Sequence, residues 1–333
     1  MVSGANVLGI GYCGIFVTNG GRFGSYVFIT NTTVYESITY NGFTNQILTI
    51  LKTWLNNNPT KRPQYVILFL DVPSRVDDSA TTCTNYPFDY GGADEYPSVS
   101  YQLAAAFIGW SPFVTHINMN GTNDCIAYIN KLSAFGTNTL IISASAGGYG
   151  NTNYYFDDTR YGYGSPSPSI GSNAVSGVLS VNSTASVIYS NAVDSGLPDH
   201  ITTGFNIAGY MSWGAHSSLA TDYAINEDVQ LSATNSGWYL IDTIESFNGE
   251  RYQAGQGNFT EWFSGTAFGG TNYSNTPIGG VSSVDEPYAL GSSNTRIYFG
   301  LWASGKNFGI CAWNSWWGGE NQFQAVGDPF VVR

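Results

Sequence analysis

A histidine and a serine in two polar segments of this sequence could together carry out nucleophilic catalysis. His216 follows a Trp-Gly-Ala stretch whose small residues would leave its ring accessible, and Ser246 follows Glu245 in a second segment. Histidine is the side chain best suited to move protons near neutral pH, and an adjacent base activates a serine hydroxyl. The pattern predicts a hydrolase site in which His216 acts with Ser246 or with a nearby carboxylate such as Glu245.

Each of these residues also has a purely structural interpretation. A histidine such as His216 can serve only to hydrogen-bond its own turn. A serine that follows a strand, as Ser246 does, is often the cap of a helix, and the G-x-S-x-G motif of serine hydrolases is absent from the sequence. The catalytic and the structural interpretations both stay open at this point.

A third polar segment contains Arg75 and Asp77, directly after an apolar run at residues 65–70. The segments with His216 and Ser246 likewise follow predicted strands, at residues 205–213 and 238–244. In an open parallel sheet, ligands bind outside the carboxyl ends of the strands, which share one edge. We therefore expect Arg75 or Asp77 to lie near His216 and Ser246.

The order of predicted elements favours an α/β fold. The unbroken apolar run at residues 65–70 is typical of an inner strand of a parallel sheet, buried on both faces. Apolar residues at helical spacing predict a helix capped by Thr44 before this strand, and one capped by Asn123 that ends near Gly136. This alternation predicts a three-layer domain with a mainly parallel sheet and helices on both faces.

The remainder of the chain is expected to belong to the same domain, which spans residues 1–333. The Gly-, Tyr- and Ser-rich stretch at 147–172 is predicted to be a long, ordered surface loop. A helix is expected at 183–193, and further strands are expected at 281–284 and 296–302. Strands at 6–12 and 139–143 complete the predicted sheet.

The composition is unusual because few residues are charged. Charged residues make up 10% of the 333, and the formal net charge is −12. The few scattered basic residues argue against nucleic acid and anionic lipid surfaces as partners. No apolar run reaches the roughly 18 residues of a spanning helix. A neutral, hydroxyl-rich surface favours a secreted or cell-surface protein, whose signal peptide was removed or whose export follows another route.

The cysteines and paired aspartates suggest no resident cofactor. The disulfide candidates Cys13, Cys83, Cys125 and Cys311 would fit two disulfides in an oxidising compartment, and buried thiols fit equally well. No C-x-x-C pair exists, so zinc is not indicated. The paired aspartates at 77–78 and 157–158 could bind a structural calcium ion through their oxygens, although EF-hand spacing is absent and solvated loop carboxylates are the alternative.

Several short stretches, in order from about residue 60 to the end, resemble an uncharacterised family of exported bacterial proteins. They are Tyr65-Val66-Ile67-Leu68, Val72-Pro73-Ser74-Arg75, Ser98-Val99-Ser100-Tyr101-Gln102-Leu103, Tyr155-Phe156-Asp157, Gly209-Tyr210-Met211-Ser212-Trp213-Gly214, Glu245-Ser246-Phe247, Glu286-Pro287-Tyr288 and Val326-Gly327-Asp328-Pro329.

The closing Gly-Asp-Pro and the strand–His–strand arrangement are similar to gingipain-type cysteine peptidases, which have a caspase-like fold. The resemblance implies the same fold here, with His216 at the histidine position and Ser246 near the position of the nucleophilic cysteine. No cysteine stands there, and the thiolate is the nucleophile in such enzymes. The resemblance therefore implies the fold rather than the activity.

Three functions stay open. The first is a non-catalytic structural protein, a pseudoenzyme on a peptidase-like scaffold that forms a homo-oligomer, filament or surface layer; 40 Gly, 23 Tyr and low charge favour it. The second is an exported hydrolase that uses His216. The third is a glycan-binding surface protein, because the aromatic segment from Trp313 to Gly319 would suit stacking on sugars, although these residues could equally pack in the core.

Overall fold

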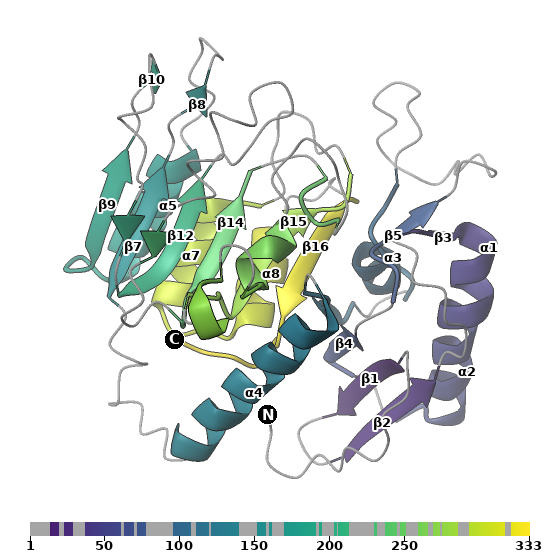
Figure 1. Cartoon of the computed structure of the whole chain (residues 1–333). Helices are drawn as coiled ribbons and strands as arrows, with labels where there is room; N and C mark the ends of the chain where they lie inside the picture. Colours follow the sequence, from purple (N-terminus) through teal and green to yellow (C-terminus); the bar gives the residue numbers. More distant parts are fainter. Residues whose placement is uncertain are drawn as a thin grey trace.

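A ten-stranded sheet runs through the centre of the molecule, with strand order β2-β1-β4-β6-β16-β15-β14-β12-β7-β9 (Figure 1). Its strands are β1 Gly14–Asn19, β2 Phe23–Phe28, β4 Tyr65–Phe69, β6 Phe113–Ile117, β7 Asn153–Asp157, β9 Ser186–Ser190, β12 Ile207–Ser212, β14 Leu240–Thr243, β15 Gly279–Ser283 and β16 Phe323–Gly327.

The structure is a computed structural model, and it describes most of the chain. The described residues are 14–19, 23–28, 37–60, 63–69, 72–77, 96–107, 111–119, 121–139, 152–157, 160–161, 170–190, 193–194, 203–204, 206–212, 230–231, 237–244, 247–250, 259–265, 269–273, 275–285, 293–316 and 321–333.

Most neighbouring strands of the sheet are parallel, as the sequence predicts. Strands β9, β7, β12, β14 and β15 follow one another in parallel, and β4 is parallel to β6. Antiparallel pairs occur between β1 and β2, β1 and β4, and β15 and β16. Parallel pairing needs crossover segments of a dozen or more residues, which the helices supply. The predicted α/β class with a mainly parallel sheet is confirmed.

Strand β4 is an inner strand, because its two sets of alternating side chains enter different clusters of the core. Val66 and Leu68 pack with residues of the helical segment at 40–57 and of α3 Val99–Ala105, whereas Ile67 belongs to the larger cluster on the other side. Both neighbours of β4 in the sheet, β1 and β6, are hydrogen-bonded to it. The unbroken apolar run therefore reflects burial on both faces.

Helices cover both faces of the other half of the sheet as well. Phe156 of β7 packs on Phe299 of α7 Thr295–Ala303, with ring centroids 4.8 Å apart. Tyr210 of β12 packs on Trp262 of the 3₁₀ helix η5 Phe259–Phe263, at 5.3 Å. Figure 1 shows α7 and α5 Ile170–Val181 behind the sheet, and α4 Thr122–Thr139 in front of it. The three-layer prediction is confirmed.

Two glycines allow α5 and α7 to pack backbone against backbone. A Cβ atom added to Gly177 of α5 would lie 2.1 Å from the carbonyl oxygen of Arg296, and one added to Gly300 of α7 would lie 3.1 Å from the carbonyl oxygen of Gly177. Real Cβ atoms essentially never show the approach at Gly177, and the one at Gly300 is tighter than most real Cβ contacts. Glycine is therefore required for this close approach, and not for any special backbone angle.

Gly177→Ala is expected to lower the free energy of unfolding by about 2–3 kcal/mol, because the added methyl group must push the two helices apart. Urea denaturation of the wild type and the variant measures the change. Gly121→Ala is the matched control, since its Cβ would lie 3.5 Å from its nearest neighbour, Asp124 Oδ2. Equal losses in both variants would contradict the close packing of α5 on α7.

Three predicted elements are wrong in type. The stretch at 147–172, expected to be a surface loop, contains the sheet strand β7, whose five residues are all buried. The helix expected at 183–193 is replaced by the strand β9. The strand expected at 296–302 is the helix α7, in which Tyr298, Phe299 and Trp302 are buried. In β7 and α7, burial on most sides removes the polar–apolar alternation that distinguishes a helix from a strand. Burial does not explain β9, whose five residues are all exposed or half-buried.

Two predicted helix boundaries are also wrong. The first helical segment begins before Thr44, because the hydroxyl of Thr39 accepts a hydrogen bond from Gly42 N at 3.1 Å and caps α1 Tyr40–Phe43. This segment continues through the π-helix η1 Thr44–Leu48 into α2 Thr49–Asn57. Helix α4 begins at Thr122 and passes through Gly136 to Thr139. The strand predicted at 6–12 and all but the first residue of the one at 139–143 lie outside the described residues.

Short strand pairs lie outside the main sheet: β3 Ser37–Thr39 with β5 Arg75–Asp77, β8 Arg160–Tyr161 with β10 Val193–Asp194, and β11 Thr203–Gly204 with β13 Gln230–Leu231. Helix α8 Phe308–Ser315 precedes the last strand. Within the described part of the chain, none of the helices has both the length and the apolarity that a membrane crossing requires.

Candidate functional site

Three parallel neighbours of the sheet, β7, β12 and β14, end at the same edge. Phe156 of β7 lies opposite Met211 of β12, and Ser212 of β12 lies opposite Thr243 of β14. The last residues of the three strands, Asp157, Ser212 and Thr243, are all buried. This edge is where ligands bind in open α/β sheets, so the segments that follow these strands are the candidate site.

The predicted catalytic residues follow two of these strand ends directly in the chain. His216 comes four residues after the end of β12, and Glu245 and Ser246 come two and three residues after the end of β14. All three residues lie outside the described part of the structure. The contact between His216 and Ser246 stays a prediction, whereas the neighbouring strand ends from which they extend are observed.

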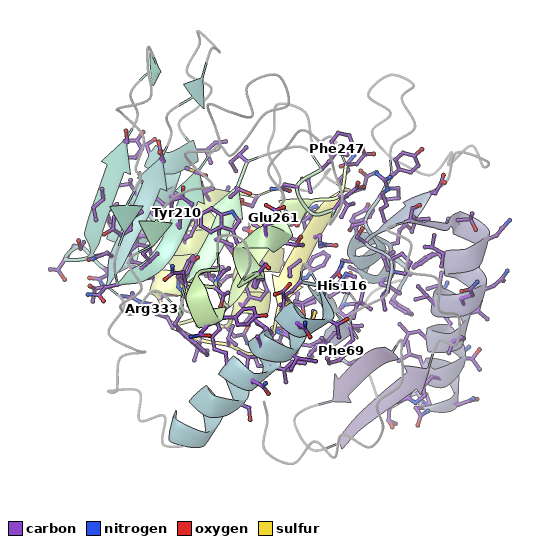
Figure 2. All side chains as sticks on the ribbon, in the orientation of Figure 1. Phe69, His116, Tyr210, Phe247, Glu261 and Arg333 are labelled. Carbon is purple, nitrogen blue, oxygen red and sulfur yellow. The ribbon has the colours of Figure 1, made fainter. Side chains whose placement is uncertain are left out.

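The turn that follows Ser246 is fixed to the sheet by hydrogen bonds. Asn248 is fully buried, and its Nδ2 donates to Thr243 O and Oγ1, at 2.9 and 2.8 Å. Its Oδ1 accepts from Ser283 N at 2.9 Å, and Gly249 N donates to Ser283 O at 2.8 Å. Phe247 has a φ of 58°, a left-handed conformation that non-glycine residues rarely adopt. Figure 2 shows Phe247 at the upper side of the molecule.

An ion pair joins this turn to the segment that follows β4. Arg75 Nη1 contacts Glu250 Oε1, and Glu250 is 5% exposed. The guanidinium carbon of Arg75 also lies 4.6 Å from the ring centroid of Tyr96, in a cation–π geometry. Two of the three polar segments singled out in the sequence therefore meet. The expected reason, a shared edge of parallel strand ends, is wrong for Arg75, because β4 runs antiparallel to β14. Asp77, also predicted near the site, lies two residues further along β5, opposite Thr39 of β3.

Sequence reasoning missed a buried carboxyl group in β14. Asp242 is fully buried, its Oδ2 is hydrogen-bonded to Ser293 Oγ, and its Oδ1 has no hydrogen-bond partner among the described residues. Burial raises the pKa of Asp242 to about 7, and the Ser293 hydrogen bond partly opposes this. A charged residue inside the apolar run at 238–244 was the signal available in the sequence.

The two described cysteines are buried thiols that do not belong to the segments after β12 and β14. Cys125 in α4 is 4% exposed, its Sγ lies 3.4 Å from Met119 N, and Cys311 in α8 is 0% exposed. Burial raises the pKa of the Cys311 thiol far above its ordinary value. Cys125 and Cys311 do not form a disulfide with each other. Cys13 and Cys83 lie outside the described residues, so the predicted disulfides stay a prediction. A thiol with a raised pKa is a poor nucleophile.

The predicted binding groups outside this edge are only partly described. Across the described residues, no cluster of His, Cys, Asp or Glu could hold a metal ion. Asp78 and Asp158 lie outside the described residues, so the calcium site stays a prediction.

In the aromatic segment predicted to suit glycan binding, Trp313 packs on Phe323 with ring centroids 5.4 Å apart, and its Nε1 donates to Val114 O at 2.8 Å. Trp313 therefore takes part in packing.

Comparison with solved structures supports a caspase-like arrangement. The chain is similar to the crystal structure of the Arg-specific cysteine proteinase gingipain R, with a TM-score of 0.53 and 13% sequence identity over 88% of this chain and 69% of that one. A structure described as a protease matches at 10% identity over 92% of this chain and 71% of its own, with a TM-score of 0.47. The predicted peptidase-like fold is confirmed at the level of the scaffold.

Sequence comparisons give no family assignment. No protein-family model matches the chain, and no curated protein matches it significantly.

Proposed function

We propose that this protein is a non-catalytic, exported or cell-surface protein that acts through contact with copies of itself, on a scaffold of the peptidase type. The observation that carries the proposal is the segment after β14. It reads Ile244-Glu245-Ser246, with no thiol at the position where the gingipain-type peptidases have their nucleophile. Without its nucleophile, such a scaffold loses several orders of magnitude in rate.

The composition of the chain supports assembly as the function that remains. Only 34 residues are charged, so little charge is available to oppose association. Tyr supplies a large contact area with a hydroxyl group for water or a partner. The net charge of −12 opposes association only through long-range repulsion, which salt screens beyond roughly 10 Å at 0.1 M.

Two measurements test this proposal. We expect thiol-alkylating activity probes to leave the folded protein unlabelled at any functional site and peptide substrates to remain intact, because no cysteine directly follows β14 and the described thiols are buried. We expect sedimentation velocity to show association that strengthens as salt is raised from low to moderate concentration. Labelling that increases together with proteolysis would overturn the non-catalytic assignment. A monomer at high protein concentration in both salts would overturn assembly.

A hydrolase is the second candidate, and the fixed turn after Ser246 favours it. Asn248 and the Arg75–Glu250 ion pair hold this turn at the edge where His216 is predicted to lie. Preorganised positioning of this kind is what a nucleophile requires. A fluorophosphonate probe that labels the wild type but not Ser246→Ala or His216→Ala would favour the hydrolase. Equal or absent labelling in all three proteins would favour the non-catalytic protein.

A further inference from the structure

The turn between α5 and β9 carries a sequence that can accept a glycan (Figure 1). Asn182, Ser183 and Thr184 match the pattern Asn-x-Ser/Thr, in which the Asn side-chain amide is the acceptor of N-linked sugars. So short a pattern carries little weight by itself, because a chain rich in Asn, Ser and Thr contains it by chance. It occurs five times here, beginning at Asn31, Asn120, Asn182, Asn258 and Asn272. The copy at Asn182 is the one whose three residues all lie in the described part of the chain.

The hydroxyl that the pattern requires contacts the amide that would be modified. Thr184 Oγ1 donates a hydrogen bond to Asn182 Oδ1 at 3.0 Å, and Thr184 N donates to the same oxygen at 3.2 Å. Hydrogen bonds to the charged form of a group favour that form. Two donors at Oδ1 therefore stabilise the negative charge that develops on the amide when its nitrogen loses a proton to the transferring enzyme.

The nitrogen that would carry the sugar is available. Among the described residues, Asn182 Nδ2 has no hydrogen-bond partner. Asn182 itself is half-buried, and the two residues that follow it, Ser183 and Thr184, are exposed. The reacting amide therefore lies in a surface turn, as an N-linked glycan requires.

A second Asn in the chain shows the contrast. Asn58, Pro59 and Thr60 have the same first and third residues as the turn at Asn182, but proline in the middle position blocks glycan transfer. Asn58 Nδ2 donates to Trp54 O at 2.8 Å, so this nitrogen is occupied. The two turns therefore differ at the atom that would react, and Asn58 is an internal control.

The surroundings of Asn182 lack a polar cover of their own. Residues 170–193, which comprise α5, β9 and the turn between them, include no Asp, Glu, Lys or Arg. Val181, the neighbour of Asn182, is 52% exposed. A glycan is bulky and solubilising, so one attached at Asn182 would shield this apolar side chain and hydrate an uncharged part of the surface.

We infer that Asn182 is an N-glycosylation site. The co-reactant is a glycan linked through phosphate to a lipid carrier. In the transfer, Nδ2 forms a bond to the anomeric carbon and loses one proton, and the lipid phosphate leaves with the electron pair of the broken carbon–oxygen bond. The inference rests on the proposed export of the chain, because N-linked glycans are carried by surface loops of secreted proteins.

The first experiment examines the protein isolated from the organism that produces it. Chymotrypsin cuts after Leu179 and Tyr189, so it releases a peptide, 180–189, in which Asn182 is the sole asparagine. We expect tandem mass spectrometry to find this peptide with a glycan on Asn182. The peptide 56–65, which contains Asn58, should be unmodified.

The second experiment compares two neighbouring variants in the same host. Thr184→Val removes the required hydroxyl at nearly constant shape and should abolish the glycan. Ser183→Ala, its matched control, changes the middle position, where the pattern accepts any residue but proline, and should keep the glycan. Thr184→Ser, which restores a hydroxyl, should also be modified. Circular dichroism checks that all three variants are folded.

The outcomes separate the site from the proposed function. An exported protein whose peptide 180–189 is unmodified would overturn the site and leave export standing. A protein that is retained in the cytoplasm would overturn both export and the site. A modification of Asn182 that persists in Thr184→Val would be independent of the pattern and would overturn its assignment as N-glycosylation.

Discussion

Replacing Arg75 with methionine is expected to lower the free energy of unfolding by about 3 kcal/mol. Glu250 is 5% exposed, and the guanidinium of Arg75 contacts its carboxylate. A buried carboxylate that loses its ion-pair partner keeps its desolvation cost, and this typically amounts to 3–5 kcal/mol. Because the Arg75 side chain is 22% exposed, solvent will reduce the loss toward the lower end of that range.

A double-mutant cycle isolates the ion pair from the rest of the Arg75 side chain. Arg75→Met combined with Glu250→Met should cost less than the sum of the single changes, with a coupling energy of at least about 1 kcal/mol. Arg296→Met, at an exposed position on α7, should change stability by no more than about 0.5 kcal/mol. Additive losses in the cycle would mean that the pair does not hold the turn after β14.

Replacing Asp242 with asparagine is expected to remove a strong pH dependence of stability between pH 4 and pH 7. In the folded protein the pKa of Asp242 is raised from 3.8 to about 7 by burial, so the native state binds a proton that the unfolded state has released. Its contribution is fully present below pH 3.8 and is lost as the pH rises through 7. The difference between the two pKa values corresponds to roughly 4 kcal/mol.

Asparagine cannot ionise and can keep a hydrogen bond to Ser293, so the variant should gain stability over the wild type as the pH rises from 4 to 7. Urea denaturation at four pH values measures the difference in the free energy of unfolding between the variant and the wild type. The contributions of the other carboxyl groups are the same in both proteins and cancel in this difference. The series stops at pH 7 because desolvation lowers the pKa of the half-buried Lys131, which donates to Thr276 and Pro277, to about 7. A constant difference between the two proteins would show that Asp242 does not titrate as expected.

The inner strands were predictable because each buried strand corresponds to a local run of apolar residues in the sequence. The runs at 65–70, 205–213 and 238–244 each contain a strand of the sheet, and the run at 281–284 overlaps the end of β15. Elements of more ambiguous composition were not predictable. β7 is rich in Tyr and lies in a Gly-rich stretch, and α7 is buried around Tyr298, Phe299 and Trp302. Both depend on partners distant in sequence, such as the packing of Phe156 on Phe299.

For the candidate site, the sequence by itself determined which segments follow strand ends, and it placed Arg75 in one of them. Only the tertiary structure decided that Arg75 meets Glu250, and that Asn248 ties its turn to Thr243 and Ser283. The physical reason is that an apolar run is formed by residues adjacent in the sequence and can be recognised there. The two residues of the ion pair are far apart in the sequence, and only the folded sheet brings them together. The uncharged run at 170–193 was equally visible in the sequence, but its position at the sheet edge followed from strand order alone.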